Sequence, residues 1–472
     1  MTWKYIESVL WILVMTSGLT LSGQGLFESS LNNTPEETGN DLLTLGGFVR
    51  SAAYLGKTPV MEDPYLQSAY GQAGLLLKIN SGTRASAVAD IRFRYGTEWQ
   101  KPVSEIMLRE AYVSLQTGPV GFKLGKLIAP WGKATMYNPV NKLTPMDPTV
   151  RSPEEDDMNL GIWALQSSIT LGSYLKLTGT WNPLYQPGKL LVDPVPMPGY
   201  VYFLEPDFPG VTLNQSSYGI QMDLRAPALD AALYGFEGYH GWPGIAFDSF
   251  LLDSVTMEPQ ALNIYEKAYR IRMAGADLAL PAGSWILRAE GAWFEALDDH
   301  DGIEYLPFPE LSYTAELERS GSWWTAIAGY YGKYILDYTP AQAEPGLSAE
   351  MDQILPLLQG GADPGPGIVD AALREQLAAF NRLYNYQLEQ VYHSAFLVLK
   401  GDFLHSTLEL SVPVSYTITT EEWMAQPALS WIPVDGLRLK AGYQGLWGGS
   451  NTLYDLVGPV LNAGFLSLTF KF

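Results

Sequence analysis

The chain has 472 residues, no cysteine and a formal net charge of −21, and 47% of its residues are hydrophobic. The acidic excess disfavours nucleic acid as a partner, because a polyanion would be repelled. Beyond the N-terminal region, no stretch reaches the roughly 18 consecutive apolar residues that a helical membrane span needs. Aromatic residues reach 12% while charged residues are only 17%. This balance suits strands whose ends carry aromatic side chains at two membrane interfaces.

The N-terminal region has the order of a secretory signal peptide. Lys4 precedes the apolar run 9–15, and small residues follow at Gly23 and Gly25. We predict a signal peptide over residues 1–25 and a short periplasmic segment over 26–42. The alternative is an N-terminal membrane anchor, although the apolar run is too short to span. The segment 26–42 is too short for a globular plug, but it leaves room for a small hatch.

From Leu43 onward, apolar and polar residues alternate, which is the pattern of strands with two different faces. The segment 83–95 shows it best. One face carries Ala85, Ala87, Ala89, Ile91, Phe93 and Tyr95, and the other carries Arg84, Ser86, Val88, Asp90, Arg92 and Arg94. A wall that faces lipid on one side and a polar lumen on the other produces this alternation.

Short and long connections alternate along the strands. The short ones contain residues suited to tight hairpins and lie at 80–82, 117–119, 172–173, 226–227, 281–283, 320–321, 401–402 and 434–436. The long ones lie around 56–66, 97–104, 133–158, 183–214, 241–263, 297–309, 338–388, 419–422 and 448–459. This alternation predicts an all-β fold, a transmembrane antiparallel β-barrel of about 18 strands over residues 43–472, with long extracellular loops.

Nine charged residues are predicted to line the pore: Arg50, Lys78, Arg84, Asp90, Arg92, Arg94, Arg270, Arg272 and Arg288. Arg84, Arg92 and Arg94 share one face of the most regular strand. Guanidinium groups in a pore attract carboxylates and phosphates, so these three residues predict an anion-selective track. The alternative is a structural ladder of ion pairs, in which Asp90 and Glu110 neutralise the arginines.

The most distinctive connection is the loop 133–158. Its prolines make it stiff and extended. We predict that this loop folds into the barrel and narrows the pore, whereas packing on the rim is the alternative. The residues predicted for the constriction are Trp131, Asn138, Asp147, Arg151, Glu154 and Glu155.

The loop 338–388 is predicted to contain two helices. Ser348 and Asp370 are candidate N-caps, and each precedes apolar residues at helical spacing. The glycine- and proline-rich stretch 360–367 separates the two segments. A helical hairpin here is a candidate lid or plug over the pore. A capping structure on the rim and a surface that binds a partner are the alternatives.

Two stretches resemble a known family. Leu466, Leu468, Phe470 and Phe472 alternate with polar residues, which resembles the C-terminal strand that the barrel-assembly machinery of the bacterial outer membrane recognises. Gly-Lys-x-x-x-x-Trp-Gly over 125–132, then Asn-Pro, Pro-x-Asp-Pro, Arg and Glu-Glu resemble the motif of a broad group of outer-membrane porin-like barrels related to the alginate-export porins.

The resemblance implies an 18-stranded barrel that passes a solute or a polymer without energy input. It also implies a location in the bacterial outer membrane after Sec-type signal cleavage, contact with membrane lipid and lipopolysaccharide, and assembly through Phe472. Family members more often have Gly-Arg-Gln where this chain has Gly125-Lys126-Leu127. Because inward glutamates also dilute the basic lumen, alginate is not the expected substrate.

Enzymatic activity is not expected. The four histidines, at 240, 300, 393 and 405, do not share a face with the serine or acid that a barrel hydrolase needs. We expect no catalytic residue, no metal site and no cofactor. The sequence predicts a passive channel for small polar, anionic solutes or an exported polymer. The main alternative is a non-conducting barrel, a scaffold or assembly partner with a plugged lumen.

Overall fold

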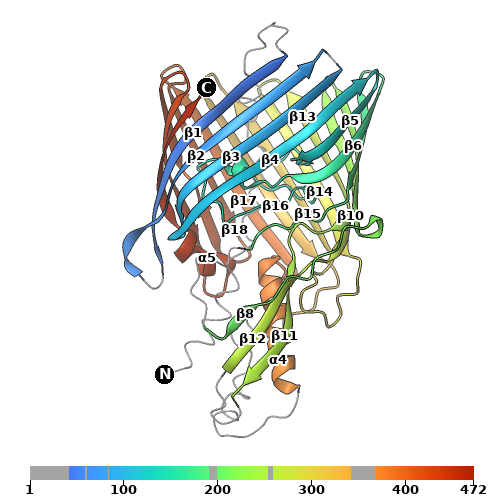
Figure 1. The fold of residues 1–472 in the computed structure, drawn as a ribbon, viewed down its shortest axis with the longest axis vertical. Helices are drawn as coiled ribbons and strands as arrows, with labels where there is room; N and C mark the ends of the chain where they lie inside the picture. The colour runs from blue at the N-terminus through green and yellow to red at the C-terminus, as the bar shows by residue number, and fades with distance from the viewer. Residues whose placement is uncertain (1–41, 59–60, 83, 191–198, 254–258, 342–366) are drawn as a thin grey trace.

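The computed structural model describes residues 42–58, 61–82, 84–190, 199–253, 259–341 and 367–472. They form a closed antiparallel barrel with an additional three-stranded sheet at one end (Figure 1). The main sheet has 19 strands, but two of them, β19 and β20, both pair with β18 and β21 and are parts of one interrupted barrel strand. The barrel therefore has 18 strand positions, as predicted, and β1 pairs with β22 to close it.

In chain order the barrel strands are β1 (Leu43–Thr58), β2 (Met61–Ser81), β3 (Ala85–Glu98), β4 (Lys101–Thr117), β5 (Val120–Leu127), β6 (Ile162–Leu171), β7 (Leu175–Asn182), β9 (Ser217–Ala226), β10 (Leu229–Tyr239), β13 (Arg270–Ala282), β14 (Trp285–Ala296), β15 (Glu310–Ser320), β16 (Trp324–Ile335), β17 (Val391–Phe403), β18 (Leu408–Thr417), β19 (Glu422–Ala425), β20 (Ala428–Val434), β21 (Leu437–Trp447) and β22 (Ala463–Lys471). Closure of the sheet gives the N–H and C=O groups of every strand a hydrogen-bond partner, which lipid could not provide.

The alternation in the sequence explains which face of each strand turns inward. On β15, Ser312, Thr314 and Glu316 are buried in the barrel interior, whereas Leu311 and Leu317 are each 43% exposed on the outer wall. Strand β3 follows the prediction in the same way, with inward, buried Arg92 and Arg94 and outward, exposed Phe93 and Tyr95. A polar interior and an apolar exterior are what a membrane barrel requires.

Most of the predicted hairpins are confirmed, and three predictions of connections are wrong. The strand β17 continues through Gly401-Asp402 to Phe403, and the turn follows at 404–406, where the backbone has positive φ. The connections around 56–66 and 97–104 are not long. Strand β2 already begins at Met61, and only Trp99 and Gln100, both with positive φ, separate β3 from β4.

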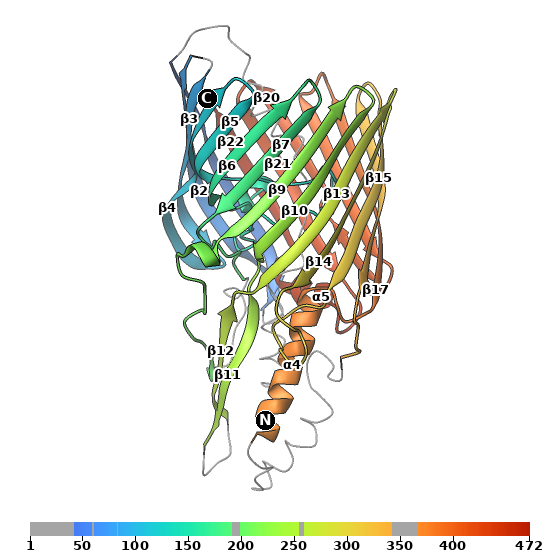
Figure 2. The ribbon, with the colours of Figure 1, turned by 90° about the vertical axis from the view of Figure 1, so that its right-hand side faces the viewer.

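A smaller assembly projects from the end of the barrel that carries the long connections, the long-loop end (Figure 2). It contains β8 (Val201–Phe203), β11 (Gly244–Leu252), β12 (Pro259–Lys267) and α4 (Ile368–Tyr384). The Asn381 amide ties α4 to β11, because it donates to the Ile245 carbonyl at 2.9 Å and accepts from the Ile245 N–H at 3.0 Å. Helix α4 is the predicted second helix, although it begins two residues before the predicted cap, Asp370. The predicted helix after Ser348 lies outside the described residues.

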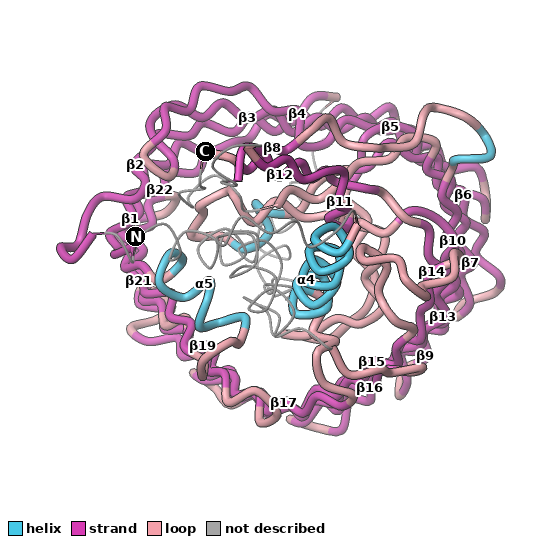
Figure 3. The backbone as a smooth tube through the Cα atoms, turned by 90° about the horizontal axis from the view of Figure 1, so that it is seen from below, coloured by secondary structure: helices cyan, strands magenta, loops and turns pink. Residues whose placement is uncertain are grey.

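In the view along the barrel, loops and the helices α4 and α5 (Leu453–Leu461) overlap much of the ring of strands, although α4 lies beyond the strand ends (Figure 2 and Figure 3). Helix α5, which the sequence analysis did not predict, packs against β21 and β1. In the described part of the chain, no helix is long and apolar enough to cross a membrane. The predicted signal peptide 1–25 lies outside the described residues, as does the segment 26–42 apart from Leu42.

Candidate functional site

The loop between β5 and β6, residues 128–161, lies inside the barrel. Its first half is held by carboxylates of the opposite wall. Glu290 of β14, only 4% exposed, accepts hydrogen bonds from three backbone N–H groups of the loop, those of residues 133, 134 and 140, at 3.0, 3.2 and 3.1 Å. Glu316 of β15 accepts from the N–H and the hydroxyl of Thr135, at 3.0 and 2.7 Å. Several donors of the loop thus converge on two buried carboxyl groups of the wall.

The Trp-Gly pair of the motif fits tightly into this anchorage. Gly132 has φ of +91°, and a Cβ there would lie 2.4 Å from Asn138 Oδ1 and 2.5 Å from Glu290 Oε2. The Asn138 amide in turn donates to the carbonyl of Trp131. The Trp131 ring is buried 5.2 Å from the ring of Tyr234 on β10. Only glycine fits at position 132, which gives the motif a structural explanation.

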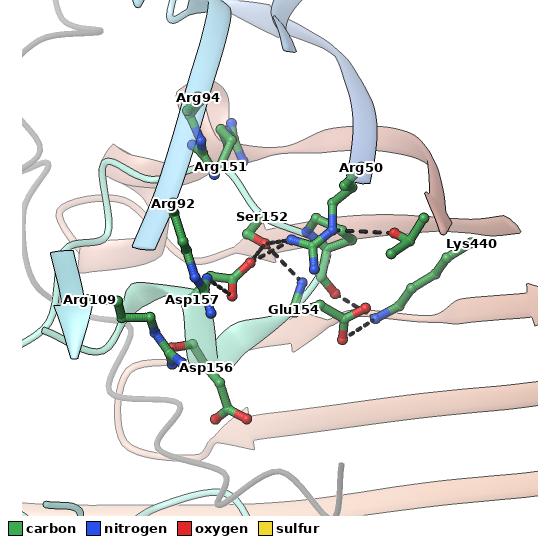
Figure 4. Close-up of polar contacts among 12 residues, drawn as sticks. Arg50, Arg92, Arg94, Arg109, Arg151, Ser152, Glu154, Asp156, Asp157 and Lys440 are labelled. Atoms are coloured by element: carbon green, nitrogen blue, oxygen red, sulfur yellow. Dashed lines mark hydrogen bonds and ion pairs between the residues drawn. The ribbon is translucent and has the colours of Figure 1, made fainter. Parts of the chain in front are cut away.

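The second half of the loop is held by arginines (Figure 4). Asp157, in the short helix η1 (Glu155–Met158), binds Arg50 of β1 and Arg92 of β3, each at 2.5 Å. Arg92 also pairs with Asp90 at 3.1 Å. Burial opposes ionisation of Asp157, but the charges of Arg92 and Arg50 outweigh it and hold the pKa of this carboxyl far below its usual range.

Arg151 connects the same half of the loop to α5. Its guanidinium donates to the carbonyl of Leu461 at the C-terminal end of α5 at 3.1 Å and to Gln67 Oε1 at 2.7 Å. It also lies 4.1 Å from the ring centre of Trp99. A helix C-terminus and an aromatic face both favour a cation. Burial nevertheless lowers the pKa of Arg151 to about 10.

The other predicted constriction residues also lie inside the barrel, with different surroundings. Asp147 is fully buried and pairs with Lys189 at 2.8 Å. Glu154 pairs with Lys440 of β21 at 3.4 Å. The side chain of Glu155 reaches water, yet protein surrounds it on most sides, and this burial raises its pKa to about 6.

Two further predicted pore residues are neutralised by the wall itself. Arg94 pairs with Glu98, and Arg288 pairs with Glu316 at 3.2 Å and with Glu318 at 2.7 Å. Together with the contacts of Arg50 and Arg92, these contacts form two groups of ion pairs, one at β1 and β3 and one at β14 and β15. The arrangement matches the alternative of the sequence analysis and not a row of uncompensated guanidiniums.

Four of the predicted pore residues are not part of these inward ion pairs. Lys78 is exposed near the turn end of β2, and Arg84 is exposed in the turn between β2 and β3. Arg270 and Arg272 are corrections, because they lie on the outer face of β13, opposite the buried Met273. A shift by one residue moves a whole strand pattern to the other face, and near an interface the outer face tolerates charge.

Two cavities lie on either side of the loop. The cavity toward the long-loop end of the barrel, the loop-side cavity, has a volume of about 140 Å³ and is lined by Tyr137 and Asn138 among others. The turn-side cavity has a volume of about 410 Å³ and is lined by Thr135 and Met136. The segment 135–138 therefore separates the two. Five acids and three bases line the turn-side cavity: Glu154, Glu155, Asp156, Asp402, Glu409, Lys400, Arg438 and Lys440.

The loop-side cavity has the opposite balance. Its charged lining consists of Lys142, Lys333 and Glu310, and Lys333 pairs with Glu310 at 2.8 Å. Lys142, a loop residue, forms no ion pair with any described residue, and its Nζ lies 4.5 Å from the ring centre of Phe294. Burial lowers the pKa of Lys142 to about 8. The charge of Glu310 opposes this shift and that of Lys333 adds to it, so the ammonium is mostly charged at neutral pH.

The rest of this cavity is polar and aromatic. Eight aromatic residues line it: Tyr137, Trp242, Phe294, Tyr331, Tyr384, Tyr386, Tyr392 and Tyr454. His240 is also part of the lining, and burial followed by the charge of Lys142 lowers its pKa to about 3, so it is neutral. The cavity therefore combines one ammonium that forms no direct ion pair with a described residue and several aromatic faces, a combination suited to a small organic anion.

Sequence reasoning missed Lys142 and Asp157. Lys142 is a single lysine between Asn141 and Leu143, and no local pattern indicates that it faces a cavity. Asp157 belongs to the acidic run 154–157, of which only Glu154 and Glu155 were predicted to lie at the constriction. The arginines on β1 and β3 were the available signal, because inward cations require acidic partners. No three histidine, aspartate or glutamate side chains in the described ranges converge as metal ligands.

No family model matches this chain, and neither does any curated protein. Solved structures of outer-membrane porins do match its fold. OccK3 (OpdO) of Pseudomonas aeruginosa is 13% identical over 95% of this chain and 99% of that chain, with a TM-score of 0.51. OpdK of the same species, solved with vanillate, is 10% identical over 91% and 98%, with a TM-score of 0.51.

A third similar structure is that of OccK2 (OpdF) of Pseudomonas aeruginosa, in complex with glucuronate. It is 12% identical over 91% of this chain and 97% of that chain, with a TM-score of 0.50. At these identities the similarity shows the fold alone. The chain is a porin-like transmembrane β-barrel.

Proposed function

We propose that this protein is a passive outer-membrane channel for small polar solutes that carry a negative charge. The fold supports a channel, because the barrel is closed and a loop crosses its interior between two cavities. Cavities of about 140 and 410 Å³ favour a small solute over an exported polymer. We also propose, from the motif alone, a distant relation to the alginate-export porins.

Lys142 is the observation that carries the preference for anions. The inward arginines, Arg50, Arg92, Arg94 and Arg288, are engaged in ion pairs, whereas the Lys142 ammonium faces the loop-side cavity and forms no ion pair with a described residue. An uncompensated charge at a narrow place in a pore sets the sign of the ions that enter it. Vanillate and glucuronate, named with two similar porins, are both carboxylates, and a carboxylate is the class of solute that we propose here.

The location and assembly route follow from the same proposal. We infer secretion through the signal peptide 1–25, insertion into the outer membrane beside lipopolysaccharide, and assembly through Phe472. Phe472 is 59% exposed, and its backbone exchanges hydrogen bonds of 3.1 and 3.0 Å with Gly47 of β1. The terminal residue thus completes the closing seam while its ring stays available to the assembly machinery.

The test is conductance in planar lipid bilayers under a salt gradient. Wild type is expected to form channels with a zero-current potential that indicates preference for chloride over potassium. Lys142→Gln is expected to shift this potential toward cations. Lys57→Gln, which removes the same charge from an exposed site at the long-loop end of β1, is the matched control and is expected to change nothing. Channels without anion preference, or a Lys142→Gln potential equal to wild type, would contradict the proposal.

Absence of channels would instead support the rival function, a non-conducting scaffold. The same bilayer experiment distinguishes a closed channel from a scaffold when residues 344–388 are deleted. Currents that arise only after this deletion would assign the role of a lid to the helical loop. Silence in both proteins would leave the scaffold as the function of the barrel.

A further inference from the structure

A short segment of the long connection before β9 lies outside the barrel wall. This segment contains the short helix η2 (Leu213–Gln215). The hydroxyl of Tyr218 donates to the carbonyl of Leu213 at 3.2 Å, and the guanidinium of Arg270 donates to the carbonyl of Asn214 at 2.9 Å. Both side chains belong to the outer faces of their strands, β9 and β13, so the two bonds hold the segment against the outside of the barrel. Figure 3 shows this small helix beyond the ring of strands, near β5 and β6.

The neighbouring residues on the outer wall indicate how deep the segment lies. Tyr218 pairs with Glu237 across the sheet, Glu237 with Arg272, and Arg272 with Glu295. These four side chains form one outward row, and charges on the lipid face are tolerated near an interface but costly at the midplane. Toward the turn end, the next outward residues of β9 are apolar: Ile220, Met222 and Leu224. The row therefore marks the boundary between headgroups and hydrocarbon.

Two apolar side chains of the segment are left bare at this boundary. Val211 is 74% exposed and Leu213 is 70% exposed. Burial of apolar side chains away from water is favourable, so water is an unfavourable surrounding for both. A second copy of the chain is a poor candidate to cover them, because a stable protein interface buries at least about 1,200 Å² in total. Around a single barrel at this depth, the surrounding medium is lipid.

We propose that residues 210–214 form a membrane anchor, in which Val211 and Leu213 insert into the lipid leaflet at the long-loop end of the barrel. Arg270 holds the anchor at headgroup level, where its aliphatic stem follows the wall and its guanidinium stays polar. Tyr218 occupies the position of an interfacial aromatic residue. The inference rests on the barrel spanning the membrane and does not depend on which solute it conducts.

The absence of cysteine from the chain makes a direct test available. Val211→Cys and Leu213→Cys are each labelled with a small fluorophore, and the protein is reconstituted in vesicles of phosphatidylethanolamine and phosphatidylglycerol. Quenching by nitroxide attached to a lipid acyl chain is compared with quenching by iodide in the water. Ile220→Cys on the outer wall, where Ile220 is 52% exposed, is the lipid control, and Glu205→Cys in the same connection is the water control.

The labels at 211 and 213 are expected to lose fluorescence to the lipid-borne nitroxide as strongly as the label at 220, and to be shielded from iodide relative to the label at 205. Quenching that matches position 205 would overturn the anchor. Resonance energy transfer between fluorophores on different molecules would also overturn it, because it would assign the patch to self-association. If the label at 220 itself met water, the membrane-spanning barrel would be wrong and not only the anchor.

Discussion

The two halves of the loop 128–161 are attached to opposite walls of the barrel by opposite chemistry. In the first half, buried carboxylates of Glu290 and Glu316 accept hydrogen bonds from the loop, mostly from its backbone. In the second half, Arg50 and Arg92 of the wall bind one loop carboxylate, Asp157. The first attachment depends on the path of the backbone, and the second depends on loop side chains, among them Asp157 and Arg151. Inward charges can therefore hold a loop in place without selecting ions.

The largest expected effect is the loss of the side-chain attachment. Asp157→Ala leaves Arg50 and Arg92 buried without their shared partner, which is expected to cost about 3 kcal/mol, near the lower end for a broken buried pair because Asp90 still contacts Arg92. The readout is urea-dependent unfolding in detergent, together with protease cleavage within 133–158. Glu155→Ala, the exposed neighbour in the same helix, is the control. Equal stability of the two variants would show that the arginines do not hold the loop.

The backbone attachment is best broken at Gly132. Gly132→Ala places a Cβ against Asn138 and Glu290 and forces a side chain into positive φ. The combined cost is expected to be roughly 2–3 kcal/mol. Gly118→Ala is the control, because it also forces a side chain into positive φ, at +57°, while nothing lies within 4 Å of the new Cβ. If cleavage of the loop rises equally in both variants, strain and not the contact with the wall explains the effect.

A smaller effect is expected when the wall loses charge but keeps its shape. Glu290→Gln retains one acceptor oxygen, but its amide NH₂ faces loop N–H groups. This change is expected to weaken the attachment by about 1–3 kcal/mol. Glu237→Gln on the outer face of β10 is the control. Faster protease cleavage near residues 133–140 is predicted for Glu290→Gln alone, and an unchanged rate would remove Glu290 from the account.

The smallest effect concerns Lys142, the lysine that faces the loop-side cavity. The pKa of Lys142 is lowered to about 8, so its positive charge is present below pH 8 and is lost as pH rises through that value. The anion preference measured by the zero-current potential should therefore decline between pH 7 and pH 9. This range avoids the titration of Glu155, whose pKa is about 6. Lys142→Gln should show no such decline, and an identical pH profile would assign the titration to another group.

The barrel fold is predictable from the sequence because alternation and turn residues are local signals. Strand β3 and the turn at 434–436 are predicted from neighbouring residues alone. The faces of Arg270 and Arg272 are not, because a charge at a strand end fits either the lumen or the headgroup level. The site is less predictable still. Lys142 meets Phe294 across 152 residues of sequence, and Asp157 meets Arg50 across 107. Only the path of the loop through the barrel brings these residues together.

Paired charges thus build the interior of the barrel, and we propose that Lys142 sets its ion preference. The most direct test compares zero-current potentials of Arg288→Gln/Glu318→Gln, which removes one predicted pore arginine together with its partner at 2.7 Å, and of Lys142→Gln. We predict a wild-type potential for the paired variant and a shift toward cations for Lys142→Gln. A shift in the paired variant with no shift in Lys142→Gln would contradict the account and restore the arginines as the selecting residues.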